Sequence, residues 1–289
     1  MSNGSTSISS DPGSEFPPVK PLPEEWQVPA FTVAEFAPRQ TRYCIGIPII
    51  NEGERIQAQL QKMHTLGLYG LADIVIADGG STDGSTAAEH LTSVNVRTLL
   101  TKTGPGKLSA QLRMFFAYAM CQGYEGVVIV DGNNKDGIEA IPKFLEALDQ
   151  RFDYVQGSRY IPGGVEKNTP LMRKLAVELI HAPIISLASG FRYTDTTNGF
   201  RAISSGFLTD ERLQPFRDVF DTYNLHYYLS VMAPKLGYRV KELPVSRVYP
   251  AKGPTPSKIK GFKTHWHMIV LLFKSAFGVY RPSPPLSSK

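Results

Sequence analysis

Two kinds of hydrophobic pattern alternate along the chain. In the first, hydrophobic residues follow one another with little polar interruption, as in strands buried on both faces. In the second, they recur every three or four positions, as in amphipathic helices. The strand-like segments are residues 41–50, 72–78, 96–101, 126–130 and 152–160, and the helix-like segments are residues 54–67, 107–123 and 140–150. Because strands that alternate with helices are joined by right-handed crossovers, the pattern predicts an α/β fold with a mainly parallel, Rossmann-like sheet and helices on both faces.

The two ends of the chain differ from this pattern. The first residues are rich in Ser, Gly and Pro and contain no apolar core of the kind an export signal needs, so we expect residues 1–38 to be a flexible arm. The most apolar window, HMIVLLFKSAFGVY, is too short to cross a bilayer and contains Lys274. Residues 39–262 are therefore predicted to be one domain, and residues 263–289 a helix and tail that pack on the domain or on a membrane surface.

Composition adds modest constraints. The 289 residues are 42% hydrophobic and 20% charged, as in an ordinary soluble globular protein. Cys44 and Cys121 form no disulfide framework, so we expect two small buried thiols in a reducing cytosol. The net charge of +5 suits anionic partners such as nucleotides, lipid phosphates or a membrane surface, without choosing among them. We expect no nucleic-acid partner.

Oxygen-bearing side chains follow three of the predicted strands. The strand ends read PIINEGE, ADGGSTDGS and DGNNKDG, and their polar residues are Asn51, Glu52, Asp78, Asp131 and Asn133. Ligands of open α/β sheets bind outside the carboxyl ends of the strands, so these side chains are predicted to lie on one rim. Each residue alone has a plainer explanation, since Asn, Asp and Gly suit turns.

The turn after residue 78 shows the plainer explanation most clearly. Ser81, Asp83 and Ser85 are typical of a helix start, and Gly79 and Gly80 are typical turn residues. Asp136 could likewise begin the helix that follows it. The recurrence of such clusters at three strand ends nevertheless favours a functional site.

The order of these motifs resembles that of inverting glycosyltransferases with the GT-A fold. Those enzymes have P-x-x-N-E at the first strand end, then D-x-x-S-x-D, then a D-x-D metal motif. The second half, with GSRYIPGG, DTTNGFR and ELPVSRVYPAKGPTPSK, is similar to dolichyl-phosphate mannose synthases and bacterial polyprenyl-phosphate glycosyltransferases. The resemblance covers about residues 41–262 and implies a GT-A glycosyltransferase domain over residues 39–262.

The resemblance implies a UDP- or GDP-linked sugar as donor and Mg²⁺ or Mn²⁺ as cofactor. Asp131 and Asn133 would bind the metal, although the family usually has a second aspartate where this chain has Asn133. An amide oxygen ligates Mg²⁺ without contributing charge, so weaker binding is expected unless Asp136 compensates. The implied donor-binding residues are Pro48, Asn51, Glu52, Asp78, Gly79, Lys107, Asp131 and Gly132.

Basic residues in positions similar to those of the family would hold phosphate groups. A guanidinium group matches phosphate oxygens in geometry and charge, and several could hold both a diphosphate and an acceptor phosphate. Any one of them could instead be a solvated surface residue. The candidates are Arg159, Arg173, Arg201, Arg247 and Lys258.

The acceptor remains open at this stage. Transfer to a hydroxyl group needs a general base, for which Asp221 or Asp195 could serve, with Asp131 as the third candidate catalytic residue. Transfer to a lipid phosphate needs no base, and the glutamate typical of lipid-phosphate enzymes is replaced here by Asn224. We interpret His226 as a packed or surface residue. The basic, aromatic run 252–266 could face anionic lipids, which would make the protein cytoplasmic or peripheral on the inner face of a membrane.

The sequence thus predicts a metal-dependent inverting glycosyltransferase with a polyprenyl-phosphate or glycan acceptor, of the kind used in cell-surface glycan biosynthesis. Transfer to a small soluble acceptor by the same fold is one alternative. A non-catalytic scaffold is another, because Asn133 and Asn224 depart from the family. A sugar nucleotidyltransferase is disfavoured, since the first strand is not followed by a glycine-rich basic phosphate loop.

Overall fold

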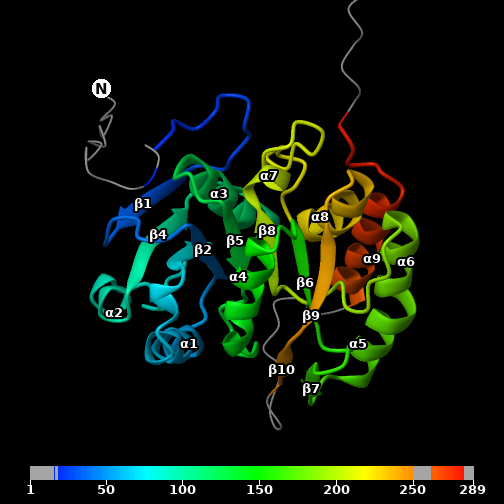
Figure 1. Ribbon diagram of the computed structural model, residues 1–289, viewed down its shortest axis with the longest axis horizontal. Coiled ribbons are helices and arrows are strands. Elements are labelled where there is room, and N and C mark those ends of the chain that lie inside the picture. The colour runs from blue at the N-terminus through cyan, green and yellow to red at the C-terminus, as the bar shows by residue number, and fades with distance from the viewer. Residues whose placement is uncertain (1–15, 17–18, 250–261, 283–289) are drawn as a thin grey trace, which may run out of the picture.

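An eight-stranded mixed sheet organises the computed structural model, which describes residue 16, residues 19–249 and residues 262–282 (Figure 1). The strands lie in the order β1-β4-β3-β2-β5-β8-β6-β9, and a small parallel pair, β7 with β10, lies beside them. The strand bounds are β1 Phe31–Glu35, β2 Tyr43–Ile49, β3 Asp73–Asp78, β4 Val96–Lys102, β5 Gly126–Ile129, β6 Tyr154–Ser158, β7 Val165–Lys167, β8 Arg201–Ser204, β9 Val240–Pro244 and β10 Ser246–Val248.

Helices cover both faces of the large sheet, as the alternating pattern predicted (Figure 1). One hydrophobic core packs α3, α6, α8 and α9 on the sheet, and the other packs α1, α2 and α4 on the opposite face. The helix bounds are α1 Glu54–Thr65, α2 Ala88–Ser93, α3 Leu108–Cys121, α4 Ile141–Asp149, α5 Leu171–Ala176, α6 Ala182–Ser189, α7 Ser205–Leu208, α8 Asn224–Lys235 and α9 Phe262–Ala276, with short turns η1 Leu68–Gly70, η2 Ile138–Ala140 and the π-helical η3 Val177–His181.

The central strand β2 is buried on both faces, which explains why its sequence is apolar at almost every position. Cys44 points into the α3 core and Ile45 into the α1 core, because successive side chains of a strand face opposite sides. At Gly46 an added Cβ would lie 2.2 Å from a ring carbon of Phe115 on α3. Glycine therefore allows α3 to pack directly on this strand.

The sheet is less uniformly parallel than its α/β pattern alone suggests. The run β4-β3-β2-β5 is parallel, and so is β6 with β9, but β8 is antiparallel to both of its neighbours, β5 and β6. Strand β8 belongs to the NGFR segment, which the hydrophobic pattern did not predict to be a strand. Its insertion between β5 and β6 brings this segment next to the strand that ends at residue 129.

The prediction of a flexible arm over residues 1–38 is wrong for the part that the structure describes. Strand β1 pairs antiparallel with β4, and Trp26 stacks on Phe216 with 3.7 Å between ring centroids. Glu35 lies beside the buried Arg97, at 3.4 Å between Oε1 and Nη2. The segment is thus ordered by pairing with an open sheet edge and by partnering a buried charge, neither of which composition reveals.

Two further local predictions also need correction. Helix α2 begins only at Ala88, so Ser81, Asp83 and Ser85 do not mark its start. Asp83 instead accepts a hydrogen bond from the Gly53 backbone N–H at 2.8 Å. Cys44 is buried as predicted, but Cys121 is only partly buried.

The C-terminal helix α9 packs on the domain, against α8 and α6, with Leu271 and Leu272 buried in the α3 core. Within the described residues, no helix combines the length and apolarity that crossing a membrane requires.

The π-helical turn carries a histidine that should make stability depend on pH. Burial lowers the pKa of His181 to about 4, and its Nδ1 lies 3.3 Å from the hydroxyl of Tyr227. In the unfolded chain the pKa is about 6.5, so below that pH the unfolded state binds more protons and stability falls. We expect this residue to lower the free energy of unfolding by about 1–2 kcal/mol between about pH 7.5 and about pH 5.

Urea denaturation of the wild type and of His181→Asn across this pH range measures the effect. The asparagine variant cannot titrate and should lose that part of the pH dependence. Parallel stability profiles for the two proteins would contradict the assignment.

Candidate active site

The carboxyl ends of β2, β3 and β5 bring the predicted rim together. Ile49 and Asp78, the last residues of β2 and β3, are in register, while Asp131 follows the end of β5. A shallow cavity of about 380 Å³ opens among the residues that follow β2 and the loop after β3. Its lining consists of Asn51, Glu52, Gly53, Glu54, Arg55 and Asp83.

The loops after β2 and β3 are tied to each other through Asp78. Its carboxylate accepts hydrogen bonds from the Gly80 and Ser81 backbone N–H groups and from the Ser81 hydroxyl, at 2.5–3.0 Å. The Ser81 hydroxyl oxygen accepts from the Asn51 N–H at 2.9 Å, and the Thr82 N–H donates to the Asn51 side-chain oxygen at 2.8 Å. Asn51, whose φ is 48°, and Asp78 thus hold a preformed double loop.

Three of the predicted donor-site residues contribute shape rather than functional groups. Pro48 is a buried residue of β2. An added Cβ at Gly79 would lie 2.9 Å from the side-chain nitrogen of Gln111, and one at Gly132 would lie 2.4 Å from the Ile49 side chain. The absence of a side chain at Gly79 and Gly132 allows the three strand-end loops to lie close together.

An arginine shared by two carboxylates forms the centre of the site. Arg247 Nη2 donates to Asp131 Oδ2 at 2.9 Å, while Arg247 Nη1 donates to both oxygens of Asp136, at 2.6 and 2.8 Å. Strand β10 brings Arg247 there because it lies against residues 135–137, with hydrogen bonds from Gly137 N–H to Ser246 O and from Val248 N–H to Lys135 O.

This shared ion pair sets the charge of the site. Burial would raise the pKa of Asp131, but Arg247 outweighs burial and holds that pKa below its ordinary value. Burial would lower the pKa of Arg247, and the two carboxylates raise it instead. Asp131 is therefore an ionised carboxylate at neutral pH, and its side chain keeps 25% exposure. Asp136 is buried, and both of its carboxylate oxygens accept hydrogen bonds from Arg247.

A group of cations surrounds Tyr249, a buried residue that sequence analysis missed. Arg173 Nη1 donates to the Tyr249 hydroxyl at 3.0 Å, and the Lys135 ammonium lies 5.1 Å from the ring centroid. Burial would raise the pKa of Tyr249, but Arg247 and Arg173 bring it below its ordinary value. Burial, helped by Arg247, lowers the pKa of Lys135. The side of the site near Arg173 is thus strongly electropositive.

Arg159 does not point a free guanidinium at a ligand. Its Nε and Nη2 donate to the two oxygens of Asp195 at 2.6 and 3.0 Å, and both residues are buried. The Asp195 carboxylate also accepts from Thr197. Asp195 as general base is therefore disfavoured, since taking a proton would disrupt a buried ion pair. We assign it the role of positioning Arg159.

Several buried polar atoms next to Asp131 have no hydrogen-bond partner among the described residues. An added Cβ at Gly199 would lie 2.5 Å from Asp131 Oδ1, so the loop before β8 touches that carboxylate. Arg201 uses Nη2 for the Thr196 carbonyl at 2.9 Å and leaves two nitrogens free. The unpartnered atoms of this group are Asn133 Oδ1, Thr196 Oγ1, Asn198 Nδ2, Arg201 Nε, Arg201 Nη1 and His226 Nδ1. Because native interiors seldom leave such atoms unsatisfied, we expect water or a polar ligand to complete them.

His226 lies within electrostatic reach of both Arg201 and Asp131. Burial, reinforced by Arg201, lowers its pKa well below the ordinary value. We expected a packed or surface residue, and the structure shows a partly buried His226 whose neutral imidazole lies near the Asp131 carboxylate.

The remaining predicted residues lie elsewhere. Lys107 is exposed at the start of α3, where its backbone N–H donates to the Asp221 carbonyl at 2.6 Å. Asp221 is exposed in the loop before α8. Asn224 is buried, with its side-chain nitrogen on the Val219 carbonyl. Lys258 lies outside the described residues.

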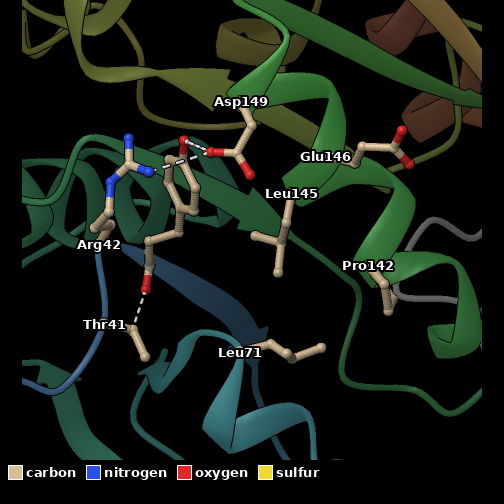
Figure 2. Close-up of a pocket in the computed structure, with 8 residues that line it drawn as sticks. Thr41, Arg42, Leu71, Pro142, Leu145, Glu146 and Asp149 are labelled. Carbon is tan, nitrogen blue, oxygen red and sulfur yellow. Dashed lines mark hydrogen bonds and ion pairs between the residues drawn. The ribbon is translucent and has the colours of Figure 1, made fainter.

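A second cavity, of about 400 Å³, lies at the opposite end of β2 (Figure 2). Tyr43, the first residue of that strand, donates to Asp149 at 2.8 Å, and Arg42 lies beside the same carboxylate. Because the strand-end loops lie at the other edge of the sheet, this cavity is separate from the candidate active site.

Comparisons with known proteins agree with this geometry. Residues 44–211, more than half of the chain, match the family model described as glycosyl transferase family 2. The chain therefore belongs to that family and is a glycosyltransferase with a GT-A-like α/β fold.

Two relatives and one solved structure are similar to this chain. An undecaprenyl-phosphate mannosyltransferase of Micrococcus luteus is 28% identical over 207 residues, 70% of this chain and 82% of the relative. A polyprenol monophosphomannose synthase of Mycolicibacterium smegmatis is 26% identical over 71% of this chain and 77% of its own. A glucosyl-3-phosphoglycerate synthase of Mycobacterium tuberculosis, solved with Mn²⁺, UDP and phosphoglyceric acid, has a TM-score of 0.59 at 13% identity, covering 85% of this chain and 80% of that one. This last likeness shows the fold.

Removing the shared arginine should destabilise the protein. Arg247→Met leaves two carboxylates without their partner, so we expect the free energy of unfolding to fall by about 3–5 kcal/mol. Adding Asp136→Asn to that variant removes one of the unpaired charges and should restore part of the loss. Denaturant unfolding of the single and double variants measures both effects. A single variant as stable as the wild type would show that the ion pair contributes little.

Proposed function

We propose that the protein transfers a sugar from a nucleoside diphosphate sugar to a polyprenyl phosphate, with inversion at the anomeric carbon. The observation that carries this assignment is the pairing of an ionised, partly exposed Asp131 with a surrounding set of buried cations and unpartnered polar atoms. The polyprenyl-phosphate enzymes among the relatives support the acceptor class.

The donor would bind at the ends of β2, β3 and β5. The preformed loops that carry Asn51 and Asp78 suit the nucleoside, and the cavity between them leaves room for it. The free nitrogens of Arg201 and Asn198 suit the hydroxyl or phosphate oxygens of the sugar diphosphate.

The residues present fit a divalent cation. Asn133 Oδ1 is a buried oxygen with no hydrogen-bond partner among the described residues, and the side-chain nitrogen of Asn133 is 3.4 Å from Asp131 Oδ2. The described residues contain no group of three or more His, Cys, Asp or Glu side chains that could hold a metal ion alone. Two protein oxygens supplemented by substrate phosphates are typical of Mg²⁺ sites, and Mn²⁺ suits the same oxygens. The bound ion would supply Lewis-acid stabilisation of the departing diphosphate.

The acceptor phosphate is already an anion and requires no general base. One of its oxygens forms the new bond to the anomeric carbon while the bond to the donor diphosphate breaks, and no proton moves. The commitment of Asp195 to Arg159 agrees with this chemistry. Arg173 and Lys135, near Tyr249, would draw the acceptor phosphate toward the site. We further propose that the protein works in the cytoplasm, on the inner face of a membrane.

A small soluble acceptor is the alternative that the same site allows. Incubation with UDP- and GDP-sugars, Mn²⁺ and either a polyprenyl phosphate or phosphorylated small molecules, followed by mass detection of the glycosylated product, separates the two. Product only with small acceptors would overturn the lipid assignment. A lack of any nucleotide binding would favour the non-catalytic scaffold.

Asp131 is expected to be essential for turnover. Asp131→Ala leaves Arg247 paired with Asp136, so the variant should fold while its kcat falls by about a thousandfold or more, as expected for the loss of an electrostatic catalytic group. Product formation and thermal unfolding measured together check this. Wild-type turnover in a folded variant would remove Asp131 from the mechanism.

Substitution at position 133 tests the metal. Asn133→Asp adds a charged ligand and should tighten Mn²⁺ binding by about tenfold, while Asn133→Leu should weaken it. Titration of Mn²⁺ in the presence of UDP, followed by the shift in Tm, gives the apparent affinities. Identical affinities in all three proteins would show that residue 133 is not a ligand.

A further inference from the structure

The helix formed by α5, η3 and α6 lies at the edge of the molecule (Figure 1). It carries a row of exposed leucines. The helix comprises α5, η3 and α6, residues 171–189, with no break between them. Leu171, Leu175, Leu179 and Leu187 are 69%, 38%, 70% and 89% exposed, and Met172 beside them is 76% exposed. Leu171, Leu175 and Leu179 are four residues apart, and Leu187 follows eight residues later. Exposed Pro183 lies midway between Leu179 and Leu187, so the four-residue spacing continues.

The π-helical turn keeps this row on one side. In an α-helix, residues four apart overshoot a full turn by about 40°, so a strict four-residue row would wind around the helix. The π-helical turn, with its i to i+5 hydrogen bonds, has more residues per turn than an α-helix. It therefore reduces the rotation around the helix axis between the leucines on either side of it. Its presence between Val177 and His181 therefore aligns the two halves of the leucine row.

The opposite side of this helix belongs to the domain and leads to the active site. Val177, Ala182 and Ile185 are buried, and α6 packs against α8. At the first turn, Arg173 hydrogen-bonds the hydroxyl of Tyr249, which lies next to Arg247. The leucine row thus begins beside the cations proposed to receive the acceptor phosphate.

We propose that the leucine row (Leu171, Leu175, Leu179 and Leu187, with Met172) docks on the surface of an anionic lipid bilayer. The proposal rests on the polyprenyl-phosphate acceptor proposed above, whose apolar chain starts directly at the phosphate and stays in the bilayer. Exposed apolar side chains on a helix that lies in the headgroup region are typical of proteins bound to a membrane surface.

Charge favours a bilayer as the occupant. In residues 164–192 Lys174 pairs with Glu166 at 3.0 Å. The remaining charges are Lys167, Arg173 and Arg192 against Glu178, a net charge of +2. A net positive charge in the segment that carries an apolar row is complementary to anionic headgroups.

Size disfavours a second copy of the chain. Sixteen residues of helix span about 24 Å, and one helix is about 10 Å wide, so the row offers about 240 Å². A stable protein interface covers about 800 Å² on each partner.

Sedimentation with vesicles tests the proposal without any donor or acceptor. The full-length protein is mixed with vesicles of phosphatidylcholine and phosphatidylglycerol in equal parts, or of phosphatidylcholine alone. We expect binding to the anionic vesicles, and a loss of about tenfold or more in Leu179→Glu and in Leu187→Glu. Leu66→Glu, at a leucine that is 45% exposed beyond the end of α1, is the matched control and should bind like the wild type.

Three results would overturn the proposal. In the first, the double variant Leu179→Glu/Leu187→Glu binds vesicles as tightly as the wild type does. In the second, the wild type does not bind vesicles. In the third, the wild type is a dimer and this double variant is a monomer. Circular dichroism melting confirms that the variants are folded. The shift in Tm with UDP or GDP and Mn²⁺ reports the donor site separately, so a failure of membrane docking is distinguishable from a failure of the proposed reaction.

Discussion

The guanidinium of Arg247, shared between Asp131 and Asp136, is the interaction on which the site depends. A buried arginine needs compensating charge, and here that charge comes from a loop more than a hundred residues earlier in the chain. The pairing fixes β10 against the loop after β5 and keeps Asp131 ionised. Because both carboxylate oxygens of Asp136 accept hydrogen bonds from Arg247, Asp136 is not available as a substitute metal ligand.

Around this centre the protein separates two chemical environments. In the loops after β2 and β3, Asp78 and Asn51 accept hydrogen bonds from neighbouring backbone groups, which preorganises the edge proposed above to receive the nucleoside. The start of β8 and the loop before it differ, because Arg201 and Asn198 have buried donors with no partner in the part of the chain that the structure describes. Such donors are costly unless water or a ligand completes them, and in the proposed reaction the polar part of the substrate would do so.

The proposed acceptor side combines cationic side chains with an exposed apolar surface. Arg173 and Lys135 lie near Tyr249, and the helix that carries Arg173 turns a leucine row away from the domain. A phosphate with a long hydrocarbon chain needs both features next to each other. The commitment of Asp195 to Arg159 completes the picture, since an anionic nucleophile needs no base.

The sequence by itself determined the α/β class, the helices on both faces and the polar rim at three strand ends, because burial and turn chemistry are local and periodic. It placed Asp131 on that rim, whereas Arg247 and the roles of both residues came only from the resemblance. Tertiary structure alone decided that β1 joins the sheet, that Asp195 is held by Arg159, and that Tyr249 lies among cations. Those outcomes depend on which distant segments meet, and pairing between buried charges far apart in the chain leaves no pattern in the sequence.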